Sequence, residues 1–461
     1  MLVFKGTELE NYAFKNLQIN PLWKHRDFVA NVIAYINSST ERVLAIGGLR
    51  GTGKTVGIMQ AGLGKDFCYI LAQRDEQQTG VDYIKALKES ENRIIAIDEY
   101  SWIRNRDELD RYLITAIQNG KRILITGTES ITLDFLNYGA INHRVGVVHT
   151  TMFTYEEYCR LYDIPQTKAS CKRFLVEGGV FRDYILNSYD ATKIYIEDAI
   201  INNLASYLGD TVSKEKAAAL TYAVLYKAIC PSNLSSIPTL RNNKITVDNF
   251  LDKMGINTDV LFCESDLKRV ADIFEKIGLI VRVKNIDAGS DVKEQYYITN
   301  PSLTCQLILA AYNINEIDQG ILGHVFEACS VVRLAANKLS EHVIYFYNHT
   351  ADPTIENDKN KELDIIITND EMEFAYLFEC KFTQNNSVDK KITLLSGDLE
   401  KTVFKHTEIL GRYIIFTGEA SVKKYNVGDI IFTPMNKMLD YYFEFSTNVN
   451  TIQKSQSVFR N

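Results

Sequence analysis

The sequence contains no apolar run that approaches the roughly 20 residues a helix needs to span a bilayer. Its first residues, "MLVFKGTELENY", lack the basic segment and apolar core of a signal peptide. The eight cysteines are scattered and never form a CxxC pair, which argues against a zinc ribbon or a disulfide scaffold and favours reduced thiols. From these absences we expect a cytoplasmic protein with no membrane partner.

The chain also lacks tracts of biased composition, and its apolar content is that of a globular protein. Its 461 residues are too many for one ordinary core, so the length predicts about two to four domains. The formal net charge of −7 argues against a protein that coats nucleic acid without specificity, but it leaves room for a basic face on one domain.

The stretch "GLRGTGKT" (48–55) matches the phosphate-loop pattern GxxxxGK(S/T) at every fixed position. It follows an apolar run that predicts a strand (42–46), and a helical pattern comes after it. Glycines let backbone N–H groups turn toward a phosphate, Lys54 places a charge on the β- and γ-phosphates, and the Thr55 hydroxyl can ligate Mg²⁺. The predicted nucleotide-binding residues are Gly48, Arg50, Gly51, Thr52, Gly53, Lys54, Thr55 and Val56.

A second buried strand, "RIIAIDEY" (93–100), ends in two acids. We expect Asp98 to hold Mg²⁺ and Glu99 to polarise an attacking water. A third strand, "RILITGTES" (122–130), carries Thr126 and Thr128 at its end, where a hydroxyl could sense the γ-phosphate or simply cap the next helix. Strands alternating with helical patterns predict an α/β fold: a parallel sheet covered on both faces, with ligands at the carboxyl ends of its strands.

These motifs, with "NHRVGVVHTTMFTYEEY" (142–158) and "FLVEGGVFRDYI" (174–185), resemble in sequence order the bacterial and archaeal AAA-type ATPases that carry a DUF4143-type C-terminal domain. The resemblance implies ATP as the nucleotide, since no guanine-reading Asn/Thr-Lys-x-Asp sequence is present. It also implies that Arg144 stabilises charge on the phosphate, in the same chain or from a neighbouring subunit of a homo-oligomer. Arg144 follows His143, a position where the family usually has glycine. The alternative role of Arg144 is to pair with a nearby carboxylate.

The middle of the chain predicts a winged helix, because three helical patterns are followed by two apolar strand runs around a polar loop. The third helix carries basic and acidic side chains together: Lys268, Arg269 and Lys276 with Asp266, Asp272 and Glu275. This mixture favours a structural or protein-contacting role over contact with DNA.

The stretch "KNKELDIIITNDEMEFAYLFECKFT" (359–383) predicts two strands joined by a turn. Glu379 and Lys381 share one face of the second strand, and Asp364 opens the first, which is the core pattern of the PD-(D/E)xK nuclease fold. With Glu327 on an upstream helix, Asp364 and Glu379 are candidate ligands of Mg²⁺, and Lys381 is the candidate catalytic lysine. Cross-strand ion pairs on a solvated face, or a nuclease-like fold that does not cut, are the alternatives.

We therefore expect an ATPase domain (1–165), a helical lid (166–212), a winged-helix domain (213–305), a nuclease-like domain (306–445) and a polar tail (446–461). The predicted function is an ATP-driven switch coupled to a domain that acts on DNA. The alternative is a regulator without cleavage activity that docks a protein or nucleic acid under nucleotide control.

Overall fold

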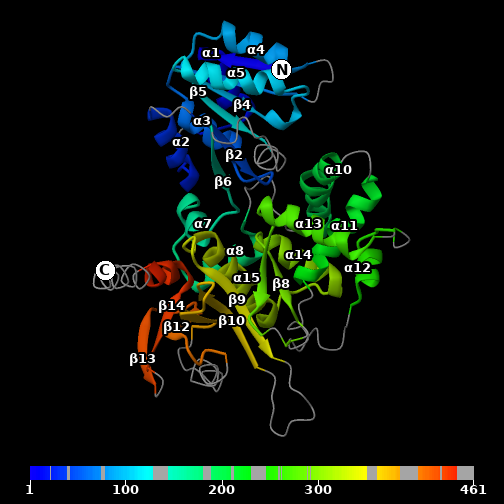
Figure 1. Cartoon of the computed structure of the whole chain (residues 1–461), viewed down its shortest axis with the longest axis vertical. Helices are drawn as coiled ribbons and strands as arrows, with labels where there is room; N and C mark the ends of the chain where they lie inside the picture. The colour runs from blue at the N-terminus through cyan, green and yellow to red at the C-terminus, as the bar shows by residue number, and fades with distance from the viewer. Residues whose placement is uncertain are drawn as a thin grey trace.

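The computed structural model describes residues 1–20, 22–38, 42–73, 78–127, 144–179, 188–208, 212–229, 245–257, 260, 262–287, 289–290, 292–349, 361–384, 403–425 and 428–443. Thr128 and His143 lie outside these ranges. Figure 1 shows a first unit, coloured blue to cyan, above a second unit that runs from green to red, with β6 leading toward the second. In the part of the chain that is described, no helix has the length and apolarity to cross a membrane.

The first unit is built on a sheet of six described strands in the order β1-β3-β4-β5-β2-β6. Only β1 is antiparallel to its neighbour; the other adjacent pairs are parallel. The strands are β1 (Leu2–Lys5), β2 (Val43–Gly48), β3 (Phe67–Leu71), β4 (Ile94–Asp98), β5 (Arg122–Thr126) and β6 (Val145–Thr150). The described helices are α1 (Gly6–Asn11), η1 (Tyr12–Asn16), α2 (Asp27–Asn37), α3 (Lys54–Gly62), α4 (Gly80–Glu89), η2 (Tyr100–Trp102) and α5 (Asp107–Gln118).

Helices cover both faces of this sheet. One hydrophobic cluster packs α4 and α5 against it through side chains such as Tyr83 and Leu113, and another packs α2 and α3 through Val32 and Ile58. Burial on both faces explains why the central strands read as continuous apolar runs rather than alternating ones. The α/β class and the parallel sheet predicted for this half are thus confirmed.

The second unit combines helices with a mixed sheet of eight described strands, in the order β13-β14-β12-β11-β10-β9-β7-β8. Its strands are β7 (Ile280–Asn285), β8 (Glu294–Ile298), β9 (Val343–His349), β10 (Lys361–Thr368), β11 (Phe374–Cys380), β12 (Glu408–Phe416), β13 (Ser421–Tyr425) and β14 (Gly428–Pro434). Its described helices are α7 (Tyr155–Leu161), α8 (Lys168–Glu177), α9 (Tyr189–Tyr195), η5 (Ile196–Ile201), α10 (Asn202–Leu208), α11 (Lys214–Ile229), α12 (Val247–Lys253), α13 (Glu264–Lys276), α14 (Pro301–Tyr312), α15 (Gln319–Asn337) and η9 (Met435–Lys437).

The expected three helices and hairpin are present as α11, α12, α13 and the β7–β8 pair. The hairpin does not stand alone, because β7 pairs in parallel with β9 and so joins the C-terminal sheet. One hydrophobic cluster runs through all of these elements. The boundary at 305/306 stays a prediction, since a single sheet and a single core extend across it.

Candidate functional site

The phosphate loop connects the end of β2 to the start of α3 at the carboxyl edge of the first sheet. Gly48 has φ +140°, and a Cβ there would lie 2.1 Å from the Thr150 Oγ1 of the neighbouring β6. Gly53 has φ +83° and directly precedes α3. Only glycine fits the first position without displacing β6, so the loop owes its course to the fixed residues of the motif.

Lys54 is the first residue of α3 and is 7% exposed. Its Nζ donates hydrogen bonds to the carbonyl oxygens of Gly48 (2.7 Å) and Leu49 (2.9 Å). The ammonium group therefore lies against the loop itself, where it can exchange neutral carbonyl contacts for a phosphate.

Asp98 ends β4 and is only 2% exposed. Its Oδ2 accepts a hydrogen bond from Thr55 Oγ1 at 2.7 Å, and its Oδ1 accepts bonds from Thr126 Oγ1 and from the backbone N–H of Glu99, the latter at 3.0 Å. The parallel strands β4 and β5 are neighbours, so the side chains at their carboxyl ends meet. The structure thus brings together Thr55, Asp98, Glu99 and Thr126, as the sequence predicts.

Tyr69 is a residue at this site that the sequence reasoning missed. It lies on β3, and its hydroxyl donates to Asp98 Oδ2 at 2.6 Å. Burial, together with the adjacent Asp98 carboxylate, raises the pKa of Tyr69 well above its usual value. The ring of Tyr12 stacks beside it, with 5.8 Å between centroids. A tyrosine within an apolar strand run carries no motif, so only its place on β3, next to β4, could have indicated the contact.

Arg144 is not brought to the phosphate loop of its own chain. It directly precedes β6, whose first residue, Val145, pairs with Val43 at the amino end of β2. The loop follows the carboxyl end of β2. The six residues of this strand, each rising roughly 3.3 Å, therefore separate Arg144 from the loop. Action within the same chain is therefore at odds with this fold, and a role from a neighbouring subunit stays a prediction. Four more predicted loop residues remain. Gly51 has φ +83°, and the Thr52 hydroxyl donates to the carbonyl of Leu49 at 2.8 Å. The carbonyl of Arg50 accepts a bond from the Tyr195 hydroxyl at 3.2 Å, and Val56 packs on the core.

The four residues predicted in the second unit form a carboxylate–lysine cluster: Glu327, Asp364, Glu379 and Lys381. Lys381 Nζ donates to Glu379 Oε1 at 2.5 Å, and Asp364 Oδ2 accepts from the Cys380 backbone N–H at 2.6 Å. Glu327, on α15, accepts a bond from the hydroxyl of Tyr297 at 3.1 Å. Burial of Glu379 argues against the alternative of ion pairs on a solvated face.

The members of this cluster shift one another's pKa values. Burial raises the pKa of Glu327 well above its usual value, and the charges of Asp364 and Glu362 raise it further. Burial lowers the pKa of Lys381, but Glu379 and Asp364 outweigh that effect and raise it overall.

The cluster does not form a ready metal site in this geometry. Within the described ranges, no group of three or more histidine, cysteine or acidic side chains is arranged to hold a metal ion. The reason is visible in the contacts: Glu379 is paired with Lys381, Asp364 with a backbone N–H, and Glu327 with Tyr297. The expected metal ligands Glu327, Asp364 and Glu379 thus gather without converging on one point.

No family model matches the sequence, and no curated protein does either, so the resemblance to ATPases with a DUF4143-type domain finds no support there. Among solved structures, the chain is similar to the Aeropyrum pernix Orc1 protein in complex with DNA, at 12% identity over 65% of this chain and 96% of that one, with a TM-score of 0.28. It is similar to the Thermotoga maritima RuvB Holliday junction branch migration motor, at 13% identity over 63% and 96%, with a TM-score of 0.28. It is also similar to the S. cerevisiae Hsp104–ADP complex, at 13% identity over 72% of this chain and 44% of that one, with a TM-score of 0.29. At TM-scores this low, the likenesses place neither a ligand nor a partner on this chain.

Proposed function

We propose that the chain binds ATP with Mg²⁺ at the phosphate loop, hydrolyses it, and uses the nucleotide as a conformational switch. The observation that carries this proposal is that two hydroxyl groups donate to the Asp98 carboxylate: that of Thr55, which follows the lysine of the loop, and that of Thr126. A magnesium ion, when bound, would offset the negative charge of the phosphates. Thr55 and Asp98 are oxygen donors of the kind it prefers, so the residues fit the group.

The remaining roles follow from the contacts of each side chain. Lys54 would leave the two loop carbonyls for the β- and γ-phosphates and hold them as a point charge. Glu99, whose backbone N–H is tied to Asp98, would accept a proton from the attacking water. Thr126 would orient that water or the γ-phosphate.

The test is the Lys54→Ala variant of the full chain. We expect it to abolish phosphate release and to weaken ATP binding in calorimetry, because the main contact to the β- and γ-phosphates is gone. Lys65→Ala, which alters an exposed lysine in the turn after α3, serves as the control and should behave like wild type. Unchanged turnover in Lys54→Ala would refute the assignment of the first unit.

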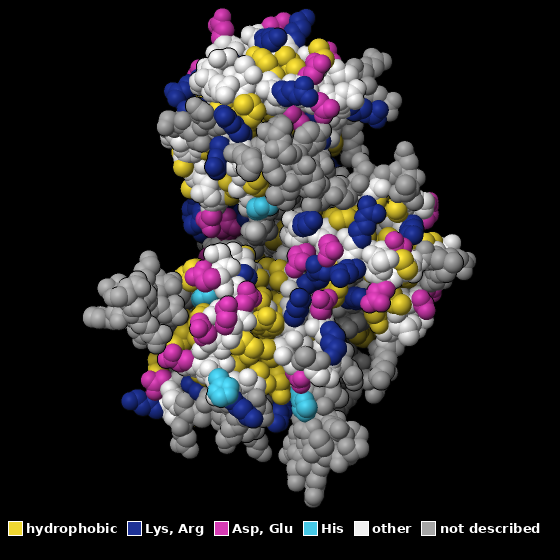
Figure 2. Space-filling view, viewed as in Figure 1, with side chains coloured by type: hydrophobic (Ala, Val, Ile, Leu, Met, Phe, Trp, Pro, Cys, Tyr) yellow, Lys and Arg dark blue, Asp and Glu magenta, His cyan; other side chains and the backbone are white. Residues whose placement is uncertain are grey.

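For the second unit, the contacts favour the regulator without cleavage activity over the nuclease. The acids of the carboxylate–lysine cluster are already engaged with a lysine, a backbone N–H and a tyrosine, and no cleavage step follows from that arrangement. A partner protein or a nucleic acid remains the proposed ligand of this unit. Figure 2 shows acidic and basic side chains interspersed on the described part of one face, a pattern more typical of protein contact than of a nucleic-acid groove.

A titration with Mn²⁺ decides between these two functions of the second unit. We expect no calorimetric binding that depends on Asp364, and no nicking of supercoiled DNA by the purified chain. Nicking that requires Mn²⁺ and disappears in both Asp364→Ala and Lys381→Ala would establish the nuclease instead.

A further inference from the structure

The sequence motif "TYEEY" (154–158) has no part in the proposed hydrolysis, yet it holds α7 in place. Thr154 begins this helix, and its hydroxyl accepts the N–H of Glu157 at 3.1 Å. The hydroxyl of Tyr155 donates to the carbonyl of Thr167, just before α8, at 2.9 Å. The Tyr158 ring packs against Phe174 of α8, with 5.5 Å between centroids. These contacts fix α7 on the second unit.

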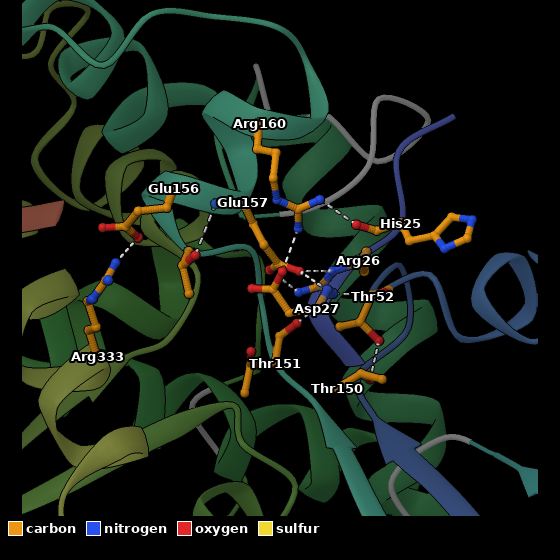
Figure 3. Close-up of polar contacts among 11 residues, drawn as sticks. His25, Arg26, Asp27, Thr52, Thr150, Thr151, Glu156, Glu157, Arg160 and Arg333 are labelled. Carbon is orange, nitrogen blue, oxygen red and sulfur yellow. Dashed lines mark hydrogen bonds and ion pairs between the residues drawn. The ribbon is translucent and has the colours of Figure 1, made fainter. Parts of the chain in front are cut away.

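The Glu157 carboxylate faces the opposite way, toward the first unit (Figure 3). It forms a two-pronged ion pair with Arg26, with Nε to Oε1 at 3.0 Å and Nη2 to Oε2 at 2.6 Å. The two residues are 3% and 5% exposed. Burial alone would raise the pKa of Glu157, but the hydrogen bonds and charge of Arg26 outweigh it and lower that pKa. The pair is therefore a charged and geometrically fixed contact.

The same guanidinium group holds the phosphate loop. Its Nη1 donates to the carbonyl of Thr52, inside the loop, at 2.7 Å and to the carbonyl of Thr151, just after β6, at 2.9 Å. Arg26 directly precedes α2 and lies over the ring of Phe153, 4.6 Å from its centroid. One side chain thus joins the loop, the end of β6 and α7, which a lysine with its single charged point could not do.

Two further contacts tie the loop to the second unit. Leu49 of the loop belongs to the hydrophobic cluster of that unit, and Tyr195 of α9 donates to the carbonyl of Arg50. On the far side of α7, Glu156 forms an ion pair with Arg333 of α15, the helix that also carries Glu327 (Figure 3). A cleft of about 600 Å³, lined by Arg26, Glu157 and Arg333 among others, lies beside these contacts.

We infer that Arg26 is a positioning residue for the phosphate loop. We also infer that its ion pair with Glu157 couples nucleotide binding to the contact between α7 and the first unit. This inference rests on the proposed function, because it names how that same site is regulated. Nucleotide binding needs the Thr52 peptide in one place, Arg26 donates to its carbonyl, and Glu157 fixes the guanidinium group of Arg26 through two hydrogen bonds. Coupling between two events is reciprocal, so nucleotide must also stabilise the α7 contact.

The first experiment needs no variant: hydrogen exchange of the α7 amides (155–161) in the wild-type chain, with and without ADP. We expect ADP to slow this exchange, since it favours the state in which Arg26 and Glu157 are paired. Calorimetric ADP binding with no change of exchange in α7 would overturn the coupling and leave the proposed function intact. No ADP binding in calorimetry would overturn both.

The second experiment compares Glu157→Gln with Arg160→Gln. Both residues lie on α7 and contact the start of α2, but Arg160 reaches only Asp27 and the carbonyl of His25 and does not touch Arg26. We expect Glu157→Gln to weaken ADP binding about tenfold, the effect of losing one good charged hydrogen bond, and to abolish the ADP effect on α7. Arg160→Gln should bind ADP like wild type. A purely structural ion pair would instead lower the thermal midpoint of Glu157→Gln with ADP affinity unchanged, and that result would refute the inference.

Should Glu157→Gln not fold, Arg26→Lys gives the same test by removing the fork while keeping the charge. It should weaken ADP binding. Wild-type affinity in Arg26→Lys would contradict the positioning role.

Discussion

The phosphate loop and the carboxylate–lysine cluster both gather the residues that the sequence predicts, but they differ in what those residues contact. At the loop, three hydroxyl groups and one N–H converge on Asp98, and Lys54 contacts main-chain carbonyls. In the cluster, Lys381 is paired with the buried carboxylate of Glu379.

This difference decides which site is ready for a ligand. A lysine held by carbonyls gives up neutral partners when it meets a phosphate, whereas Lys381 would leave behind a buried and uncompensated carboxylate. We therefore propose that the loop receives an anion, whereas in the cluster the ammonium group of Lys381 neutralises the carboxylate of Glu379. Residues of the right types that lie together are therefore not yet a site, because the contacts among them decide what else they can bind.

Asp98→Asn should have the largest effect, because it alters the group on which the loop contacts converge. An amide cannot accept all of the hydrogen bonds now made to the carboxylate, and it is a poor ligand for Mg²⁺. We expect ATP turnover to fall by about two to three orders of magnitude in a phosphate-release assay. Glu91→Gln, an exposed acid before β4, is the control. A loss of less than tenfold would show that the gathered hydroxyl groups do not serve catalysis.

Gly48→Ala tests whether the loop depends on its contact with β6. The added Cβ would lie 2.1 Å from Thr150 Oγ1 and 2.4 Å from its carbonyl oxygen, so we expect unfolding free energy to drop by about 2–4 kcal/mol in urea titrations. The matched control is Gly64→Ala, which has φ +77° but no atom within 4 Å of the new Cβ. It should lose only about 1 kcal/mol from backbone strain. Equal losses in the two variants would mean that the close approach to β6 is unimportant.

Glu327→Gln tests the carboxylate–lysine cluster through the pH dependence of the unfolding free energy. The pKa of Glu327 is raised in the folded chain, so its contribution to stability is full below its unfolded value of about 4.3 and is lost as pH rises through the folded pKa. We expect Glu327→Gln to have a higher unfolding free energy than wild type at pH 8 and the same unfolding free energy at pH 4, measured by urea titration.

Glu316→Gln, an exposed acid before α15, should show the wild-type pH dependence. Addition of Mn²⁺ at pH 8 should leave wild type unchanged. A stabilisation by Mn²⁺ that Glu327→Gln lacks would contradict the account of the cluster given above and would restore the metal site.

The sequence was sufficient for the phosphate loop because its determinants are local: eight consecutive residues and the strand before them. Asp98 and Thr126 could be added because parallel strands end at one edge. The prediction for Arg144 did not take strand direction into account: Arg144 lies at the amino ends of the parallel strands, whereas the loop lies at their carboxyl ends.

Contacts between distant segments that carry no motif were beyond prediction. Arg26 lies in no motif, and its four hydrogen bonds go to residues at positions 52, 151 and 157. Period-two alternation indicated that Glu379 and Lys381 share a face. The pairing of β10 with β9, however, shifts in register between Leu363 and Ile366, around Asp364, and this shift has no signal in the sequence. Likewise, the β7–β8 hairpin was predicted, whereas its parallel pairing with β9 has no local signal.

Tyr69 is a residue at the candidate site that no sequence motif predicted, and Tyr69→Phe isolates its hydroxyl. The ring and its stacking on Tyr12 remain, while the 2.6 Å bond to Asp98 Oδ2 is lost. We expect turnover to fall about fivefold, near 1 kcal/mol, with a higher Mg²⁺ concentration at half-maximal rate, because Asp98 is held less firmly. In the control, Tyr35→Phe, the lost hydroxyl contacts the carbonyls of Arg42 and Ile123 instead, so stability should drop and the Mg²⁺ requirement should not change. A shared loss of stability with no change in Mg²⁺ requirement would make Tyr69 a packing residue and leave Asp98 held by the two threonines and the N–H of Glu99 alone.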